Sequence, residues 1–342
     1  MPHRTFFWFV LPSAFAMLLF IALPIVSVFV QSLYIEHERV IKVTENCDPF
    51  GCKKETRVDA EATQKLLAAE PLGRFNGLGT YFNRKHLATS EVAEQWRASS
   101  GAIDFFVRLL DLPFYKALLF TLSYLIVVTP FVIALGFLIA LAVNGLPGII
   151  KGPVIFTSLL PMIITPLIGS LVLFWMIDSS GIIGAMIQKL AGDPTLSLKA
   201  SSTLTWLTLF VYGIWHQTPF AFVVFYAGLQ TVPFDTVESA MIDGANRFER
   251  IRYVVIPHLA PLAVFIALIL LMDNFRVFEP IVGFSAEAHA TSLSWAIYND
   301  LRTTGSPNFG SAAATSMLTI LGVCLLLTPV LIRTWREYNS KS

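Results

Sequence analysis

Polar side chains gather at the end of one long apolar stretch. Residues 253–272 contain no lysine, arginine, aspartate or glutamate, and ionisable residues follow at once. In a continuous helix, Asp273, Arg276 and Glu279 would share one face, since residues three apart lie on neighbouring turns. Ionisable groups set in apolar sequence usually face a cavity or pair with one another, and both interpretations stay open. The residues predicted to line a solute pathway here are Asp273, Asn274, Arg276, Phe278 and Glu279.

An earlier apolar stretch contributes aromatic rings and an amide. Tyr212, Trp215 and Gln217 lie close together in it, next to His216. Aromatic faces combined with hydrogen-bonding groups suit a small polar ligand, so we expect the first three side chains to join the same pathway. A lone histidine within such a stretch more often bonds to a neighbouring helix than to a metal, and no metal site is predicted.

Motifs that would make the chain an enzyme are missing from the sequence. It contains no Gly-x-x-x-x-Gly-Lys-Ser/Thr, no His-Glu-x-x-His and no Gly-x-Ser-x-Gly, so it lacks the usual signatures of nucleotide, zinc-protease and serine-hydrolase sites. The 24 basic and 23 acidic residues nearly balance, which gives no indication of nucleic-acid binding. We therefore predict neither catalysis nor a bound cofactor.

The composition indicates a membrane protein. Apolar residues make up 55% of the 342 residues and charged residues only 14%, against about 25% charged in soluble domains. Uncharged stretches of 20 residues or more, each long enough to cross a bilayer as a helix, occupy residues 5–35, 117–150, 152–177, 200–234, 253–272 and 303–332.

The continuously apolar stretches favour helices over barrel strands, because a helix satisfies its own backbone hydrogen bonds in lipid. We predict an all-α polytopic protein with six transmembrane helices and a long extracytoplasmic insert between the first two. The predicted segments are 1–34 (N-terminus and first span), 35–112 (insert) and 113–336 (core), with core spans at about 117–143, 153–177, 204–230, 258–280 and 311–333, and a cytoplasmic loop at 231–257.

Basic residues predict the orientation. With a cytoplasmic N-terminus, the cytoplasmic segments carry Arg4, Lys151, Arg247, Arg250, Arg252, Arg333, Arg336 and Lys341. The short outer loops then carry only Lys189, Lys199 and Arg302. The positive-inside rule exempts a loop as long as the insert. We therefore expect both termini in the cytoplasm and the insert outside it.

The insert contains two cysteines in the string Cys47-Asp-Pro-Phe-Gly-Cys52. The four residues between them are typical of a tight turn. In an oxidising compartment this spacing favours a disulfide between Cys47 and Cys52. The alternative, two free thiols in a mobile loop, stays open. The rest of the insert is expected to be partly helical and otherwise irregular.

The cytoplasmic loop 231–257 has the sequence signals of a short helix. Asp235 and Glu238 have the spacing of a capping box, which predicts a helix over about 236–243. Gly244 then provides a stop, because glycine adopts positive φ without steric cost. An exposed helix this short is not stable alone. It either rests on lipid headgroups or docks on a cytoplasmic partner.

A second helix is predicted to follow the glycine. Asn246 and Glu249 repeat the capping pattern, and Pro257 is expected to end or kink the helix before the fifth span. The apolar face of the first helix is predicted to consist of Val237, Ala240 and Met241.

The string Glu238-Ser-Ala-Met-Ile-Asp-Gly-Ala, followed by Ile256-Pro257, resembles the Glu-Ala-Ala…Gly…Ile-x-Leu-Pro loop of ABC importer permeases. It is most similar to the carbohydrate (maltose-type, binding-protein-dependent) family, with Ser239 in place of an alanine. The resemblance covers about 1–34 and 76–336. It departs after Glu279, where Phe-Ser-Ala-Glu-Ala-His replaces Leu-Thr-x-Gly-Gly-Pro, and this weakens any transfer of substrate preference.

The resemblance implies a permease subunit of an ATP-driven importer of a sugar or sugar derivative in the bacterial inner membrane. Its partners would be a second, homologous permease, two copies of a cytoplasmic ATPase and an extracytoplasmic solute-binding protein. ATP and Mg would then be bound by the ATPase. The residues implied to couple the chain to the ATPase are Glu238, Ala240, Met241, Asp243, Gly244 and Pro257.

A secondary transporter of a small polar solute is the alternative. Many such transporters contain inverted repeats and interrupted spans, and the sequence has no clear internal repeat. A membrane-embedded enzyme would require a catalytic cluster.

Overall fold

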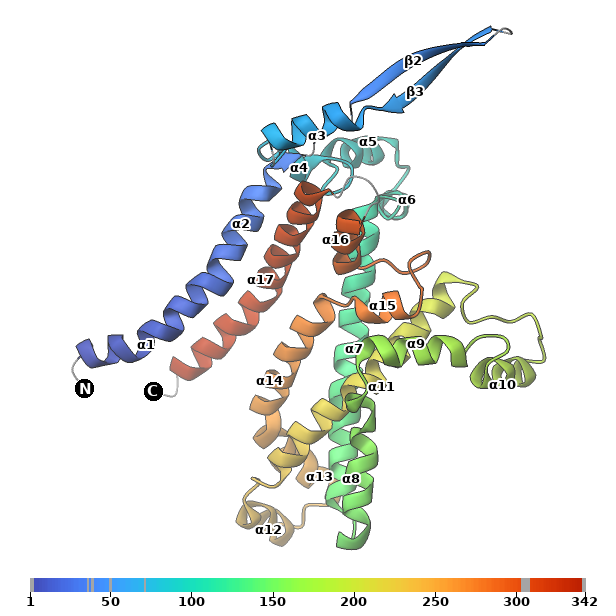
Figure 1. The fold of residues 1–342 in the computed structure, drawn as a ribbon. Coiled ribbons are helices and arrows are strands. Elements are labelled where there is room, and N and C mark those ends of the chain that lie inside the picture. The colour runs from blue at the N-terminus through green and yellow to red at the C-terminus, as the bar shows by residue number, and fades with distance from the viewer. Residues whose placement is uncertain are drawn as a thin grey trace. The chain divides into compact units, whose positions relative to one another are not determined.

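The fold is that of a mostly helical chain (Figure 1). The computed structural model describes residues 3–35, 37, 40–48, 51–70, 72–302 and 308–339. The chain divides into two compact units, which are described separately. Unit 1 comprises Met1–Tyr115 and Ala296–Leu325, and unit 2 comprises Lys116–Trp295 and Leu326–Ser342.

Unit 1 contains the predicted first span and the insert. Its first elements are α1 (His3–Met17), a π-helical turn η1 (Leu18–Ala22), α2 (Leu23–Ser32), β1 (Tyr34–Ile35), β2 (Ile41–Asp48), β3 (Gly51–Val58), α3 (Ala60–Ala69), β4 (Arg74–Phe75), α4 (Gly79–Phe82), α5 (Thr89–Ala98) and α6 (Ala102–Leu109). Strand β1 pairs antiparallel with β4, and β2 pairs antiparallel with β3. The all-α prediction was therefore wrong for the insert, where β-pairing replaces part of the irregular structure that we expected.

The β2–β3 ladder sets the two cysteines of the insert opposite each other. Its register pairs Ile41 with Val58 and Cys47 with Cys52. Directly opposed Cα atoms lie about 4.5–5.5 Å apart in antiparallel strands, which falls within the range that a disulfide spans. The side chains of both cysteines lie outside the described part of the chain, so the disulfide itself stays a prediction.

We expect mass spectrometry of unreduced, alkylated protein to recover Cys47 and Cys52 in one linked peptide. The bond would close a short loop at the end of the hairpin and limit its fraying. Alkylation is done in denaturing detergent, so that Cys324 of the last span is as accessible to the label as the insert and serves as the internal control. If Cys47 and Cys52 take up the label as fully as Cys324 without reductant, the prediction is wrong.

A buried histidine connects the insert to the start of the last helix within unit 1. His86 is 0% exposed. Its Nδ1 lies 2.8 Å from Asn83 Oδ1 and its Nε2 lies 3.0 Å from the Ser311 carbonyl oxygen. The Ser311 hydroxyl donates a 2.6 Å hydrogen bond to Asp300. Burial, the largest cause, lowers the pKa of His86 below 6.5, although the Ser311 carbonyl and Asp300 act in the opposite direction.

The elements that follow are the membrane helices and their connections. They are α7 (Pro113–Asn144), α8 (Gly148–Ile163), α9 (Pro166–Met176), α10 (Ile182–Ala191), α11 (Ser202–Leu229), α12 (Phe234–Ile242), α13 (Arg247–Arg250), a π-helical turn η2 (Ile251–Val255), α14 (Ile256–Phe275), α15 (Glu279–Gly283), α16 (Leu293–Arg302) and α17 (Phe309–Asn339). Helices α7, α16 and α17 each continue from one unit into the other.

Five helices of the described chain are long and apolar enough to span a membrane, or six spans if one bent pair counts as a span. The five are Phe6–Ser32, Pro113–Asn144, Ser202–Leu229, Arg247–Phe275 and Phe309–Arg336. The stretch that we expected as a single third span is broken: α8 and α9 meet at 93°. Thr165 has an extended backbone, and Pro166 disfavours a helical conformation in the residue before it.

Large side chains fill the core of unit 2. Phe120, Tyr124, Leu209 and Phe222 are each no more than 1% exposed and belong to one apolar cluster. Helix α11 packs against α8 and α14, and α9 packs against α15. Gly213 lets α7 approach α11, because a Cβ at that position would overlap the Tyr124 hydroxyl. This packing positions the polar residues of α11 and α14 that were predicted to line a solute pathway.

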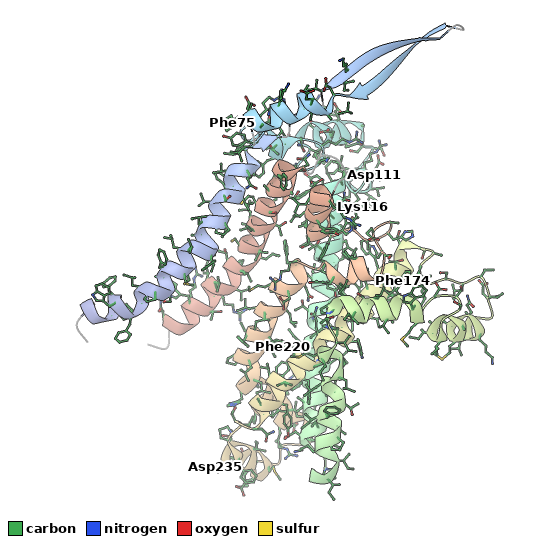
Figure 2. The ribbon with its side chains drawn as sticks, viewed as in Figure 1. Phe75, Asp111, Lys116, Phe174, Phe220 and Asp235 are labelled. Atoms are coloured by element: carbon green, nitrogen blue, oxygen red, sulfur yellow. The ribbon has the colours of Figure 1, made fainter. Side chains whose placement is uncertain are left out.

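An ion pair fixes the segment between α9 and α11. Lys199 Nζ lies 2.9 Å from Asp178 Oδ2 and 3.3 Å from the centroid of the Phe174 ring on α9. Phe174 is labelled in Figure 2. The Lys199 hydrogen bond, with help from Ser180, lowers the pKa of the Asp178 carboxyl from 3.8 to about 2. Because the folded pKa is depressed, the ion pair stabilises the fold above pH 3.8 and this contribution is lost as the pH falls towards 2.

We expect Lys199→Met to loosen this connection at neutral pH. The apolar stem would still cover Phe174, but Asp178 would lose its cation. Hydrogen–deuterium exchange should then be several-fold faster in residues 193–200, with little change in the spans. Lys189→Met, at a nearby lysine with no ion pair among the described residues, is the matched control. Equal exchange in both variants would contradict a role for the ion pair.

Candidate functional site

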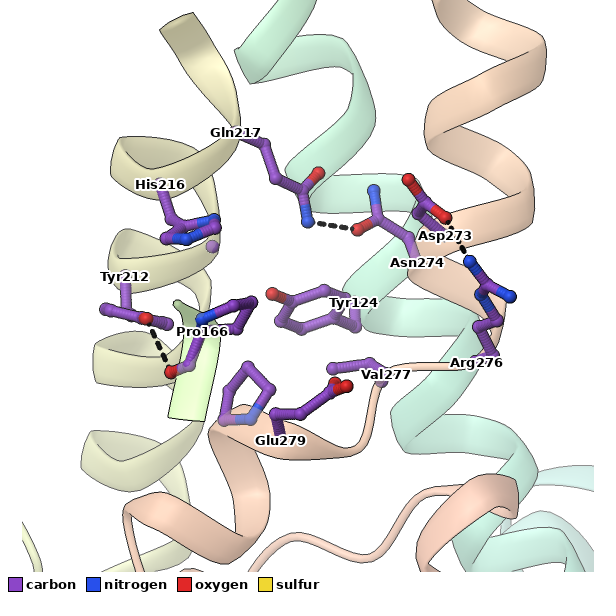
Figure 3. A pocket seen from close by; sticks show the side chains of 12 residues that line it. Tyr124, Pro166, Tyr212, His216, Gln217, Asp273, Asn274, Arg276, Val277 and Glu279 are labelled. Atoms are coloured by element: carbon purple, nitrogen blue, oxygen red, sulfur yellow. Dashed lines mark hydrogen bonds and ion pairs between the residues drawn. The ribbon is translucent and has the colours of Figure 1, made fainter. Parts of the chain in front are cut away.

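A polar cavity of about 470 Å³ opens in unit 2 (Figure 3). Four elements supply its walls: α7, the start of α9, the middle of α11, and the segment from the end of α14 into α15. The lining residues are Tyr124, Pro166, Tyr212, Gly213, His216, Gln217, Asp273, Asn274, Arg276, Val277, Glu279 and Pro280. Its volume falls within the range of about 300–1,000 Å³ that is usual for small-molecule sites.

A hydrogen-bonded chain of polar side chains crosses the wall of the cavity. Asn274 is 0% exposed. Its Oδ1 accepts a 2.7 Å hydrogen bond from Gln217 Nε2, and its Nδ2 donates a 3.0 Å hydrogen bond to the Thr129 hydroxyl. The chain connects α11, α14 and α7. Asn274 therefore lines the cavity, as predicted, but its amide is fully engaged with its neighbours and holds Gln217 in place.

Gln217 has unused hydrogen-bonding capacity. Its Oε1 is buried and has no hydrogen-bond partner among the described residues. Buried polar atoms are nearly always paired, and an unpaired one points to a missing water or ligand. Gln217 lines the cavity, so this oxygen is available to a hydroxyl donor that enters it.

Charged groups lie on one side of the cavity. Arg276 Nη2 is 2.9 Å from Asp273 Oδ1, and the two side chains are 75% and 50% exposed. Glu279 is also exposed, and its carboxylate makes no ion pair among the described residues. An exposed ion pair contributes only about 0–1 kcal/mol to stability. With two carboxylates and one guanidinium, this wall carries a net negative charge.

The helix break corrects one detail of this cluster. Helix α14 ends at Phe275 and Glu279 begins α15, so Asp273, Arg276 and Glu279 do not share a helix face as expected from their spacing. Pro280 stands in the first turn of α15, where proline's fixed φ suits a helix start. The chain turn still brings all three side chains to the cavity.

Two side chains of α11 stabilise the break between α8 and α9. Tyr212 Oη donates a 2.8 Å hydrogen bond to the Pro166 carbonyl, and His216 Nε2 donates a 3.0 Å hydrogen bond to the Ile164 carbonyl. The last carbonyl groups of a helix have no partner within it, and the His216 bond satisfies the one at the C-cap of α8. The Tyr212 bond reaches the first residue of α9. The expectation that His216 bonds to a neighbouring helix is confirmed.

Two of the predicted pathway residues lie elsewhere. Trp215 lines a separate apolar cavity of about 510 Å³ between α9, α10 and α11 and is 47% exposed. Phe278 does not line the polar cavity. Tyr124, Pro166 and Val277 do line it and were missed. Their positions depend on packing between segments far apart in the chain, and no local pattern marks them.

The loop between α11 and α14 contains the predicted helix, glycine turn and second helix (Figure 1). The predicted Asp235–Glu238 capping box is wrong: α12 begins after Pro233, which has no side-chain cap, and both acidic residues lie within the helix. The helix begins after Pro233 because the fixed φ of proline, here with an extended ψ, suits the position before a helix. Glu238 is therefore exposed in mid-helix.

The end of α12 matches the prediction closely. Gly244 has φ +81°. The Gly244 N–H bonds to the Met241 carbonyl at 3.1 Å, and the Ala245 N–H bonds to the Ala240 carbonyl at 2.9 Å. These two bonds form a Schellman motif around a C-cap at Asp243. The capping box of Asn246 and Glu249 at the start of α13 is also present.

The outward face of α12 differs from the predicted one. Val237 and Ala240 are half-buried, whereas Phe234, Met241 and Ile242 are 75%, 55% and 82% exposed. Figure 2 shows the side chains of this helix, with Asp235 labelled. The helix therefore presents large apolar side chains that nothing in the chain covers among the described residues.

The second helix of the loop was expected to end or kink at Pro257, and it does not end there. The helix continues from Arg247 to Phe275 through the π-turn η2. The Ile256 N–H reaches back five residues to the Ile251 carbonyl. Pro257 follows at the start of α14. Proline lacks the N–H that would continue the regular helical pattern. The π-turn lies just before it, and the helix remains continuous through Pro257.

Residues 112–332 match the family described as "Binding-protein-dependent transport system inner membrane component". A probable ABC transporter permease of Sinorhizobium fredii is 31% identical over 232 residues, covering 65% of this chain and 72% of the relative. The sn-glycerol-3-phosphate transport system permease UgpA of Brucella suis is 28% identical over 205 residues, covering 57% and 67%. The trehalose/maltose transport system permease MalF of Thermococcus litoralis is 31% identical over 144 residues, covering 39% and 47%.

The fold also resembles a solved structure. A chain from the crystal structure of a bacterial ABC transporter involved in the import of the acidic polysaccharide alginate aligns with a TM-score of 0.60. The alignment covers 81% of this chain and 97% of that chain, at 20% identity. At this identity the likeness concerns the fold alone.

Proposed function

The chain belongs to the family of binding-protein-dependent transport system inner membrane components, and from this membership we propose that it is one permease subunit of an ATP-driven importer of a sugar or sugar derivative. It forms half of the translocation pathway in the bacterial inner membrane, with both termini in the cytoplasm. A second, homologous permease supplies the other half. Two copies of a cytoplasmic ATPase bind ATP and Mg, and an extracytoplasmic solute-binding protein delivers the sugar.

The loop that contains α12 is the observation on which the ATPase partnership depends. A nine-residue helix is too short to be stable alone, yet α12 ends in a fully formed Schellman motif and exposes Phe234, Met241 and Ile242. Apolar anchors on a short helix are typical of helix-in-groove recognition. We infer that this face docks in a groove of the ATPase, with Glu238 at its edge.

The base of the loop is connected to the membrane helices by side-chain hydrogen bonds. Gln230 Nε2 donates to Asn144 Oδ1 at 3.1 Å, joining the ends of α11 and α7. The Thr231 hydroxyl lies 3.1 Å from His258 Nε2 on α14. These bonds support a role for the loop in transmitting a displacement of α12 to the spans.

We infer that the polar cavity is this subunit's part of the sugar pathway. Sugars present hydroxyl groups and apolar C–H faces. The cavity offers the unpaired Gln217 Oε1, the carboxylates of Asp273 and Glu279, and the rings of Tyr124 and Tyr212. Relatives of this chain are named for trehalose/maltose, arabinooligosaccharide and sn-glycerol-3-phosphate transport, which supports a sugar or sugar derivative as the solute.

The test is to purify the tagged chain with the ATPase, second permease and binding protein encoded beside it. We expect a stable complex in detergent, and ATP hydrolysis in proteoliposomes that rises when the sugar-loaded binding protein is added. Uptake should require ATP and persist when ion gradients are collapsed. Gradient-driven uptake without any ATPase would instead support a secondary transporter and overturn the proposal.

A further inference from the structure

Helix α6 turns an apolar face outwards. Ile103, Phe106 and Val107 are 82%, 60% and 59% exposed, and their spacing of three and four places them on one side of the helix. Asp104 and Arg108 lie on another side and form an ion pair at 3.0 Å. A helix on the surface of a soluble domain would present its charged side to water and its apolar side to the core.

The remaining side of α6 is already packed within unit 1. Phe105 stacks edge-on against Trp96 of α5, with ring centroids 5.0 Å apart. Both residues line a recess with Tyr115 from the first turn of α7, and the Tyr115 hydroxyl donates a 2.9 Å hydrogen bond to the Leu87 carbonyl. The helix cannot rotate its outward face inwards without breaking these contacts.

The position of α6 in the chain sets its depth relative to the membrane. It ends at Leu109, and span α7 begins at Pro113. Lys116 is the last charged residue before the uncharged stretch 117–150, so the hydrocarbon begins within a turn of that lysine. Three residues separate α6 from the start of α7, and seven separate it from the uncharged stretch, which places it at the level of the lipid headgroups.

The side chains around α6 suit that level. Trp96 is 64% exposed, and tryptophan and tyrosine are enriched at the membrane–water interface. Arg108 and Lys116 can reach lipid phosphates while their stems lie along apolar surface. A helix with one apolar face and one charged face lies in the plane of the interface with its apolar face towards the acyl chains, and α6 has Asp104 and Arg108 on its charged face.

We propose that α6 is an interfacial helix that anchors the insert to the lipid bilayer, with Ile103, Phe106 and Val107 immersed at the boundary between headgroups and acyl chains. The occupant of this apolar face is lipid, because the short connection to α7 keeps the face at membrane depth. The helix thereby fixes the insert against the membrane surface at the start of the second span.

The test measures what surrounds the face in the assembled complex. Spin labels are attached to Ile103→Cys and Phe106→Cys, in a background where Cys47, Cys52 and Cys324 are serine and assembly is verified. The complex is reconstituted in nanodiscs of phosphatidylethanolamine and phosphatidylglycerol. Collision rates with oxygen, which concentrates in lipid, and with a water-soluble nickel chelate are then compared. A label on the exposed Glu94→Cys of α5 is the matched control.

We expect oxygen collisions to exceed nickel collisions several-fold at residues 103 and 106, and the reverse at residue 94. Nickel accessibility at 103 and 106 equal to that at 94 would show a face in water and overturn the proposal. Low collision rates with both reagents would show that protein covers the face, which also overturns it. Failure of this test would leave ATP-driven uptake untouched, so it is independent of the proposed function.

Discussion

Replacement of Gly244 by valine is expected to leave the chain in the membrane and to reduce ATPase coupling by roughly 5–30-fold. The residue has φ +81°, and nothing lies within 4 Å of a Cβ built there. The effect is therefore conformational, because a β-carbon opposes left-handed φ by about 1–2 kcal/mol. A free-energy difference of this size changes the equilibrium between the native turn and an altered one by roughly 5–30-fold. The Schellman bonds from Gly244 and Ala245 would open, and α12 would lose its fixed direction.

Coupling is measured as retention of the ATPase in detergent and as ATP hydrolysis stimulated by the loaded binding protein. Gly192→Val is the matched control, since Gly192 ends α10 with φ +69° and equally open surroundings. The Gly192→Val variant should introduce similar backbone strain at its own site and leave ATPase coupling unchanged. Gly244→Asn should recover most of the coupling, because asparagine tolerates left-handed φ. Normal coupling in a Gly244→Val, Glu238→Ala double variant would contradict docking through α12.

Asn274→Ala is expected to lower both the stability of the complex and the uptake of sugar. The change removes the acceptor of Gln217 Nε2 and leaves the buried Thr129 hydroxyl without the amide that donates to it. An unsatisfied buried group costs about 1–3 kcal/mol, and each kcal/mol lowers Tm by about 2–4 °C in a domain of this size. Gln217 would also lose the bond that holds it at the cavity wall.

The thermal unfolding of the purified complex and the initial rate of uptake check this prediction. Gln230→Ala is the matched control for stability. It removes a glutamine–asparagine hydrogen bond of 3.1 Å to Asn144 that is exposed, so water replaces the lost partner. Its Tm should change little. If Asn274→Ala unfolds at the same temperature as Gln230→Ala, the buried chain of hydrogen bonds contributes nothing measurable to stability.

The sequence predicted the loop 231–257 well where local chemistry decides the structure. Gly244 and the capping box of Asn246 and Glu249 depend on a few adjacent residues, and the structure has both. The Asp235–Glu238 cap failed because a second local signal, Pro233, stands two residues earlier and starts the helix first. Two overlapping start signals cannot be ranked by spacing alone.

The cavity could be predicted only in part. Asp273, Arg276 and Glu279 were found because ionisable residues stand out against apolar sequence, but the helix end at Phe275 was not foreseen. Tyr124 escaped notice because one aromatic residue in an apolar span has no local signal, and its place beside Gly213 depends on how α7 packs on α11. The burial of Asn274 likewise follows from partners 57 and 145 residues away in the chain.

The continuity of the helix from Arg247 to Phe275 has a mechanical consequence. Its 29 residues form a rod about 43 Å long, with the loop that contains α12 attached at one end and Asp273 and Asn274 at the other. A tilt of about 10° around its midpoint would displace each end by about 4 Å in opposite directions. If α12 docks on the ATPase as proposed, the rod would act as a lever: closure of the ATPase pair at one end would shift the cavity wall at the other without any change in the helix itself.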